Sequence, residues 1–388
     1  MNSVLTISPK LARRMAIMRQ HLAGPMPSAD SNSIMDVMRD IGYLQIDPMR
    51  VVAPSHLLVL WSRLGQYNPA DLDTLLWKER SLFQDWAQAT SIVLTEDYPI
   101  FSALKRSFAK GDKPWAKRIR TWVDRNKDAH SQILTQLRLK GPLPTEAFDV
   151  KFVESWRSSG WSEGRNISTM LMILWAQGKV MIAGRKGNRK MWELTERFLP
   201  KWAPRERLSD SEVFRHAAQK SLRALGVARS RHIEHHYIRH CYGDIKHVLS
   251  ELEAAGRIVH LNIQEGKRAW PGPWYIHVDD LPLLNRLEAG EWESRTTLLS
   301  PFDNLICDRS RTEQVFDFRF RFEVYVPKSE RKYGCYVMPI LHGDRLIGRI
   351  DPVMNRKHSR LTVNAVYAEP DALKTKETGR AVAAAIDE

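Results

Sequence analysis

The pattern of apolar and polar residues predicts helices at the start of the chain. Ser8 and Pro9 form a capping residue followed by proline, which is typical of a helix start. Apolar residues then recur every three or four positions, and a second run with this spacing ends at Gly42. A third run follows Pro54 and Ser55. We therefore expect three helices, over residues 9–22, 34–41 and 57–64.

A short alternating stretch, GYLQID at residues 42–47, separates the second helix from the third. Successive side chains of a strand point to opposite faces, so Gln45 and Asp47 would share one face, about 7 Å apart along the chain. Pro48 would end or turn the strand. The simple interpretation is a strand edge with a turn-forming Asp before Pro. The alternative is an amide and a carboxylate held together for chemistry.

The middle of the chain contains a repeated order of elements. Within residues 128–203, three helical patterns precede two strand patterns around a basic turn at 184–190. Residues 209–279 have the same order, with Lys267 and Arg268 in the turn. Three helices followed by a basic hairpin are typical of a winged helix, and we interpret the N-terminal region as a divergent copy.

Strand-like segments rich in aromatic and β-branched residues follow Leu298, beginning with DFRFRFEVYVP at 317–327. They predict a small β domain, and a final helix follows it. The fold class is therefore α+β, with tandem winged-helix domains before a small C-terminal β-barrel-like domain. The expected domains are residues 1–127, 128–203, 204–290 and 291–388.

Charge narrows the class of partner. The 388 residues include 59 Lys and Arg against 45 Asp and Glu, which gives a net charge of +14. A polyanion is the natural partner, because Lys and Arg that neutralise phosphates release counterions. A basic membrane-surface protein would need a basic amphipathic helix with a continuous apolar face, which the sequence lacks. We expect no membrane association.

Cysteine and histidine spacing gives little support to a metal site. The three cysteines, Cys241, Cys307 and Cys335, lie far apart without a CxxC pair, which favours a reducing cytoplasm. A histidine cluster at 232–240 could suggest a metal, but HExxH and a second ligand cluster are missing. A wet or basic helix surface explains that cluster better. The sequence also lacks a P-loop, a dinucleotide fingerprint and GxSxG.

Basic residues gather in one run, KRSFAKGDKPWAKRIRTWVDRNK at 105–127, with Trp115 and Trp122 interleaved. The run is either an ordinary solvated helix or a surface that follows DNA phosphates. The residues expected to contact DNA if the second interpretation holds are Lys117, Arg118 and Arg120, together with Arg185 and Lys186 of the basic turn.

Two long segments resemble one family. LQIDPMRVVAPSHLLVLWSRLGQY resembles the catalytic segment of the crosslink-repair DNA glycosylases of the YcaQ/AlkX and AlkZ group. LLSPFDNLICDRSRTEQVFDFRFRFEVYVPKSERKYGCYVMPILHGDRLIGRID resembles their C-terminal β domain. The resemblance implies cleavage of the bond between deoxyribose and an alkylated guanine, including guanines joined across two strands.

The resemblance also implies site residues. The family's catalytic pair is Gln-x-Gln in one branch and Gln-x-Asp in the other, so Gln45 and Asp47 place this chain in the carboxylate branch. The chain departs from that branch at Trp86-Ala87-Gln88, where members often have Trp-x-His. Further residues expected to support or contact DNA are Arg50, Ser55, His56, Arg63, His342 and Arg345. The alternative for the first four, which lie near the pair, is a role as local cap or packing residues.

The chemistry agrees with this assignment. Breaking an N-glycosidic bond builds positive charge at the anomeric carbon, which Asp47 could stabilise while it positions water. An alkylated ring nitrogen makes the base a cation that leaves as a neutral species, so no protein acid is needed. We expect a monofunctional glycosylase that acts as a cytoplasmic monomer on double-stranded DNA, without cofactor or metal. The alternatives are a non-catalytic tandem winged-helix regulator and, with less support, an RNA-binding protein.

Overall fold

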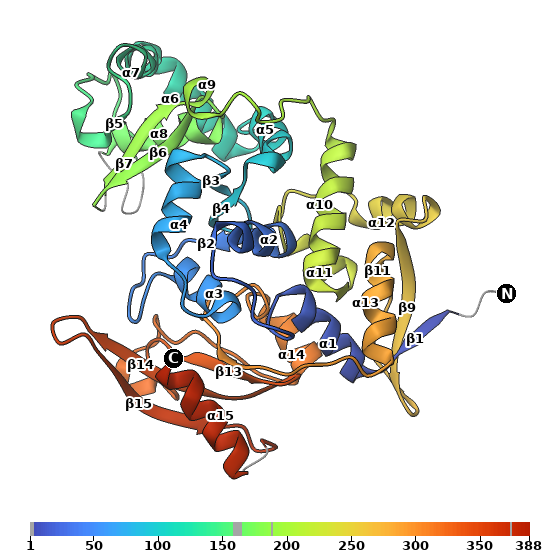
Figure 1. Cartoon of the computed structure of the whole chain (residues 1–388). Coiled ribbons are helices and arrows are strands. Elements are labelled where there is room, and N and C mark those ends of the chain that lie inside the picture. The colour runs from blue at the N-terminus through green and yellow to red at the C-terminus, as the bar shows by residue number, and fades with distance from the viewer. Residues whose placement is uncertain (1–3, 158–164, 188, 373–374) are drawn as a thin grey trace. The chain divides into compact units, whose positions relative to one another are not determined.

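The computed structural model in Figure 1 describes residues 4–157, 165–187, 189–372 and 375–388. The chain clusters into two compact units, which are described separately below. Unit 1 contains Met1–Leu72, Trp86–Val93 and Phe214–Glu388, and unit 2 contains Asp73–Asp85 and Leu94–Val213. The expected division into four consecutive domains remains a prediction.

Unit 1 begins with the helices that the sequence predicts. They are α1 (Pro9–Arg19), α2 (Ser31–Ile41) and α3 (Ser55–Leu64). The Ser8 hydroxyl accepts a hydrogen bond from the Leu11 N–H at 3.2 Å, which confirms the start of α1. Gly42, with φ of +85°, ends α2 in a conformation that suits glycine. Helix α1 is three residues shorter than expected, and His21, just beyond it, also has a positive φ.

A mixed sheet backs the first helix. It has the order β1-β9-β11-β8, with β10 paired to β9. The strands are β1 (Leu5–Ile7), β8 (Val227–Ala228), β9 (Ile258–Glu265), β10 (Arg268–Ala269) and β11 (Trp274–His277). Strand β1 pairs in parallel with β9 across 256 residues, from Leu5 opposite Leu261. The sequence did not predict this strand, which extends over three residues only.

The helices of this region follow the predicted order with one difference. They are α10 (Asp210–Leu225), α11 (Ser230–Glu234), α12 (Ile245–Ala254) and α13 (Leu281–Glu288). The second helix of the 209–279 segment, α11, ends at Glu234 and has only five residues. Gly226 precedes β8 at a close approach, because an added Cβ would lie 2.8 Å from the Met15 carbonyl. Helix α1 packs tightly there, with Ala12 and Met15 fully buried.

The C-terminal region is an open sheet rather than the expected barrel. Its order is β12-β13-β14-β15, and all neighbours are antiparallel. The elements are β12 (Thr296–Leu298), α14 (Arg309–Phe316), β13 (Met338–His342), β14 (Arg345–Asn355), β15 (Arg360–Ala368) and α15 (Lys376–Asp387). The segment 317–327, expected as a strand, has no strand assignment although Phe318 and Phe320 are buried. The final helix is confirmed.

The buried residues of α3 and of this sheet form one cluster. Leu58 of α3 packs with Tyr336, Met338 and Ile350. The apolar residues of the preceding loop lie partly buried against them: Met49, Val51, Val52 and Ala53. Unit 1 therefore fixes the loop after β2 (Tyr43–Gln45) between its third helix and its C-terminal sheet. This packing positions the candidate site.

Unit 2 contains helices and a three-stranded sheet of order β5-β7-β6. Its elements are β3 (Leu82–Trp86), α5 (Tyr98–Arg106), α6 (Pro114–Arg125), α7 (Lys127–Lys140), β5 (Leu143–Pro144), α8 (Asn166–Ala176), β6 (Val180–Lys186), β7 (Arg189–Leu194) and α9 (Thr195–Phe198). Of the three helices predicted before the hairpin, α7 and α8 are present, and the middle one is only a 3-10 turn over Thr145–Ala147. The hairpin is present, with Asn188 of its turn outside the described residues. The packing of these elements as a winged helix remains a prediction.

Candidate active site

Strand β2 leads directly into the candidate pair. It pairs antiparallel with β4 (Thr90–Leu94), with Gln45 opposite Ser91. One further bond joins the Ile46 N–H to the Thr90 carbonyl at 2.8 Å. The strand ends at Gln45, so Asp47 lies in the following loop, not on the strand face that the sequence predicts. A bend at Pro48 explains this early end.

Ser55 connects the two residues of the pair. Its hydroxyl donates to the Gln45 carbonyl at 2.7 Å and accepts from the Asp47 N–H at 3.1 Å. Ser55 is fully buried as the first residue of α3, so it supports the loop and does not face DNA as expected. The backbone around Gln45 and Asp47 is thus fixed by the start of a helix.

The Asp47 side chain bonds to its own loop. Its Oδ1 accepts a hydrogen bond from the Met49 N–H at 2.8 Å, which is the pattern of an Asx turn. Burial raises the pKa of the Asp47 carboxyl above its ordinary value of 3.8, and the bond from Met49 opposes part of that rise. Within the described part of the chain, Oδ2 receives no hydrogen bond. One carboxylate oxygen therefore orients the group.

A buried phenol lies near this carboxylate. Tyr336 is 0% exposed, and burial raises the pKa of its hydroxyl to about 12, with a smaller contribution from the charge of Asp47. The phenol is therefore neutral at physiological pH. It forms part of an apolar wall, which also contains Leu58, behind the Asp47 loop.

The tip of the β14–β15 hairpin closes the other side of the loop. The Arg356 guanidinium donates to the carbonyl of Arg50 and, at 3.3 Å, to the carbonyl of Val52. The Met354 N–H donates to the Val51 carbonyl at 3.1 Å. Sequence reasoning missed Arg356. The basic turn NRKHSR at 355–360 was the available signal, but nothing local connects it to residue 50.

Gln88 lies in the turn before β4. The turn is closed by a bond from the Ala87 N–H to the Ala89 carbonyl at 3.0 Å, and Thr90 then pairs with Ile46. The Oε1 atom of Gln88 is buried and accepts no hydrogen bond among the described residues. Gln88, at the position where histidine is expected, is therefore two residues from Thr90, whose carbonyl bonds the N–H of Ile46 beside Asp47.

Arg63 is a correction to the expected DNA contacts. Its side chain is 0% exposed and forms a bidentate pair with Asp303, with N–O distances of 2.7 and 3.0 Å. Gln20 accepts a further bond from the guanidinium at 2.9 Å. Such a pair anchors the end of α3, because removal of one partner of a buried ion pair typically costs about 3–5 kcal/mol. Arg63 therefore positions the helix that carries Ser55.

The other residues expected to contact DNA, near the pair and in the C-terminal sheet, differ in the exposure of their side chains. Arg50 is exposed, and His56 on α3 is half-buried. Arg345 is exposed at the start of β14 and pairs with Asp371, while the His342 ring contacts the Thr296 hydroxyl at 2.7 Å. Arg50 and Arg345 keep cationic groups at the surface, as a contact with phosphate requires.

The basic run of unit 2 is exposed on α6. Lys117 and Arg118 both face solvent, and Arg118 lies 4.4 Å from the ring centroid of Trp156. Arg120 instead donates to the Ala109 and Gly111 carbonyls, at 2.6 and 2.8 Å, and so ties the preceding loop to the helix. Of the two interleaved tryptophans, Trp115 is 49% exposed and Trp122 is buried. Some side chains of the run therefore face solvent, and others pack against or bond to unit 2 itself.

Arg185 and Lys186 are exposed at the end of β6, and Arg185 donates to the Gln84 amide oxygen at 3.2 Å.

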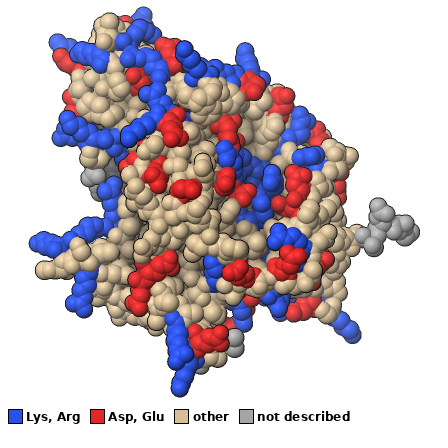
Figure 2. Space-filling view, in the orientation of Figure 1, with Lys and Arg blue, Asp and Glu red and all other residues tan. Residues whose placement is uncertain are grey.

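Figure 2 shows Lys and Arg spread over one face of the molecule with Asp and Glu among them. The positive charge is thus distributed rather than confined to the 105–127 run.

The histidine cluster is divided: His240 is exposed and His235 is half-buried, but the other two rings are buried. His232 and His236 are 4% and 2% exposed, and burial, followed by the positive charge of Arg311, lowers the pKa of each ring to about 3. The His236 ring packs on Tyr43 with 5.1 Å between centroids. Across the described residues, no three His, Cys, Asp or Glu side chains could together hold a metal ion. Nor does any described helix have the length and apolar character to cross a membrane.

Comparison with known proteins assigns the chain to a protein family. The sequence model of one family, described as DNA glycosylase AlkZ-like, matches residues 38–388. This match defines the protein as a DNA glycosylase, an enzyme of DNA repair. The chain belongs to the AlkZ-like DNA glycosylase family, which confirms the resemblance found in its sequence.

A solved structure supports the fold. The DNA glycosylase AlkZ of Streptomyces sahachiroi matches with a TM-score of 0.63 at 15% sequence identity. The match covers 98% of this chain and 95% of that one. The two proteins therefore share an architecture along their full length.

Proposed function

We propose that Gln45 and Asp47 hydrolyse the N-glycosidic bond of cationic 7-alkylguanine in DNA, including guanines joined in interstrand crosslinks. The observation that carries the proposal is the half-buried Asp47, whose backbone N–H is held by Ser55 and whose carboxylate is oriented by the Met49 N–H. The second carboxylate oxygen has no bond among the described residues. Membership of a glycosylase family favours this function over the non-catalytic regulator.

The carboxylate suits the charge that develops in the reaction. As the bond between base and sugar lengthens, positive charge grows on the sugar, and a fixed carboxylate stabilises it without reorganisation. Asp47 Oδ2 can also orient a water molecule or take its proton. The raised pKa makes the ionised Asp47 carboxylate a better base than that of an exposed Asp.

Gln45 contributes an amide beside the carboxylate. An amide can hold the water or the sugar through hydrogen bonds without adding charge. The leaving base already carries a positive charge when it is alkylated at ring nitrogen 7, so it departs as a neutral molecule. A site with one carboxylate and one amide therefore meets the needs of this reaction without a second acidic group.

The rest of the chain would bind the duplex. We propose that the helix-and-hairpin segments act as tandem winged helices and that Lys117, Arg118 and Lys186 contact phosphates. The protein would act as a monomer in the cytoplasm. Charge reversal of Lys117 and Arg118 should flatten the dependence of affinity on salt, whereas an unchanged slope would make α6 an ordinary solvated helix.

A direct test uses duplex DNA with one defined 7-methylguanine, followed by alkaline cleavage at abasic sites. Wild-type protein should produce the cleaved strand, and Asp47→Asn should not do so at a comparable rate. Asp344→Asn is a matched control, because Asp344 is also half-buried and bonded, 3.4 Å from Arg13. Equal excision by wild type and Asp47→Asn would overturn the assignment.

A further inference from the structure

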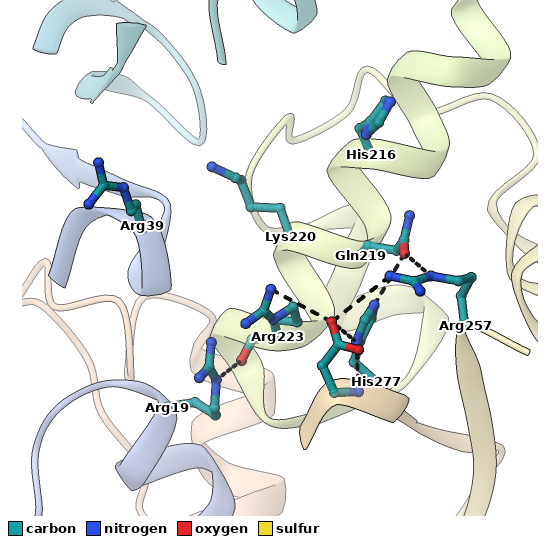
Figure 3. A pocket seen from close by; sticks show the side chains of 9 residues that line it. Arg19, Arg39, His216, Gln219, Lys220, Arg223, Arg257 and His277 are labelled. Atoms are coloured by element: carbon teal, nitrogen blue, oxygen red, sulfur yellow. Dashed lines mark hydrogen bonds and ion pairs between the residues drawn. The ribbon is translucent and has the colours of Figure 1, made fainter. Parts of the chain in front are cut away.

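Unit 1 contains a cationic pocket that shares no residue with the candidate active site. Its volume is about 330 Å³, at the lower end of the roughly 300–1,000 Å³ found for small-ligand sites. Five of its lining residues are cationic, and they come from α1, α2, α10 and the segment before β9: Arg19, Arg39, Lys220, Arg223 and Arg257. Figure 3 shows Lys220 pointing from α10 toward Arg39.

Some of this charge is already paired. Arg19 bonds Asp40 at 2.7 Å, and Arg39 bonds Asp36 at 3.1 Å. Arg223 and Arg257 share one carboxylate, that of Asp279, at 4.0 and 3.9 Å. The single negative charge of Asp279 cannot neutralise both guanidinium groups, and both distances are long for an ion pair. A positive charge therefore remains that an external anion can balance.

The cationic groups are held in place before any ligand arrives. The Gln219 amide oxygen accepts from Arg257 Nε at 3.2 Å and contacts the His277 ring at 3.1 Å. Arg19 Nε donates to the Arg223 carbonyl at 3.1 Å, as the dashed lines in Figure 3 show. Arg223 Nε is buried and has no partner among the described residues. Preorganised donors lose less side-chain entropy when they bind.

The lining also indicates what kind of ligand fits. The described residues around the pocket are Arg, Lys, His, Gln and Asp, and none is aliphatic or is Phe, Tyr or Trp. Small-molecule sites are mostly apolar, because the body of the ligand must be covered. A nucleotide would leave its base without an apolar surface here, whereas a phosphate needs only charge and donors.

We propose that this pocket binds a backbone phosphate of the DNA duplex, away from the Gln45–Asp47 pair. The proposal rests on the proposed function in one respect, that DNA is the ligand. The pocket acts as a fixed attachment point for the duplex, and Arg223 and Arg257 supply the charged donors. It therefore strengthens binding of damaged and undamaged DNA alike.

The test compares Arg223→Gln with Arg215→Gln. Both arginines lie on α10, have similar side-chain exposure (43% and 40%) and pair with one carboxylate, but Arg215 does not line the pocket. Fluorescence anisotropy measures affinity for an undamaged duplex over a series of salt concentrations. Loss of one phosphate contact should reduce the slope of log affinity against log salt by about 0.9 and weaken binding roughly eightfold at 0.1 M salt.

Arg215→Gln should keep the wild-type slope. An identical slope for Arg223→Gln would overturn the proposal. Lys220→Gln provides a second variant if Arg223→Gln does not fold. Because these measurements use undamaged DNA, their failure would leave the roles of Gln45 and Asp47 untouched, and an inactive Asp47 variant would leave the pocket untouched.

A second arm distinguishes duplex phosphate from a soluble phosphate compound. Isothermal titration of the wild type with pyrophosphate should show no binding in the micromolar range. Micromolar binding that disappears in Arg223→Gln, together with an unchanged DNA slope, would reassign the pocket to a soluble ligand and overturn the DNA proposal.

Discussion

The hydroxyl of Ser55 and the backbone N–H of Asp47 are joined by a 3.1 Å hydrogen bond, and the same hydroxyl bonds to the Gln45 carbonyl. A single buried side chain thus sets the spacing between the amide and the carboxylate. The proposed chemistry depends on this spacing, because small displacements of reacting groups have large effects on rate.

Ser55→Ala should therefore lower the single-turnover excision of 7-methylguanine by about tenfold or more, with DNA affinity unchanged. The loss of two buried hydrogen bonds should also destabilise unit 1 by about 2 kcal/mol. Ser62→Ala is the control, since Ser62 is also buried on α3 and its hydroxyl also forms two hydrogen bonds, to the Val59 carbonyl and from the Arg63 guanidinium, but none to the Asp47 loop. Equal loss of activity in both variants would show that the effect is one of general stability.

Asp47→Asn should reduce the single-turnover rate by a factor on the order of 10² or more, through loss of the charge and the base. Gln45→Ala should be impaired as well. In both variants, the affinity for a damaged duplex should stay close to that of wild type, because neither residue is a cation that binds phosphate.

The pH dependence of excision follows from the raised pKa of Asp47. The working form is the carboxylate, so the rate should fall as pH decreases through that pKa, with a midpoint above 3.8. Rates are measured against an enzyme-free control, and Asp47→Asn should lack this decline. A wild-type rate that rises toward acid would indicate that protonation of the base limits the reaction instead.

Lesion selectivity should follow the lability of the bond. Excision of 7-methylguanine and of nitrogen-mustard guanine crosslinks should be readily detected, whereas uracil and 8-oxoguanine should persist. No Lys lies between Gln45 and Arg63, so water rather than an amine of this segment is the nucleophile, and borohydride should trap no protein–DNA adduct. Efficient uracil removal or a trapped adduct would contradict this mechanism.

Stability should decrease in mild acid because of His236. Its ring is neutral in the folded protein, with a pKa of about 3, but is protonated below pH 6.5 when unfolded. The unfolded state then binds more protons, so the free energy of unfolding falls as pH decreases from 6.5, by about 2 kcal/mol at pH 5. Denaturant titrations between pH 7.5 and 5 measure this decrease, and in His236→Phe the part due to His236 should be absent. The exposed His247 is the control position, and an unchanged pH dependence in His236→Phe would contradict the prediction.

Local patterns predicted local structure well. The Ser8 cap and the glycine after α2 are found where the sequence indicates, because each depends on neighbours within four residues. The strand-like pattern at 317–327 does not form a strand, although Phe318 and Phe320 are buried. The pattern fails to predict the backbone structure of this segment. Alternation places side chains on two faces, but it does not supply a neighbouring strand for the segment to pair with.

The roles of distant pairs could not be predicted in this way. Arg63 looks like a DNA contact until Asp303, 240 positions later, is found beside it. Arg356 and the basic pocket depend in the same way on residues brought together by folding. The proposed catalytic pair, Gln45 and Asp47, was suggested by family resemblance. The geometry of the Asp47 loop could be seen only in the structure.

The bond from Arg356 to the Arg50 carbonyl spans 306 positions, and it has a consequence for the order of events during synthesis. When Asp47 leaves the ribosome, the hairpin that closes its loop has not been made. At about 5–20 residues per second, roughly 15–60 s pass before that hairpin follows. A nascent chain therefore carries Gln45 and Asp47 long before it can hold their loop in place, and under the proposed function we expect hydrolytic activity only when translation has nearly ended.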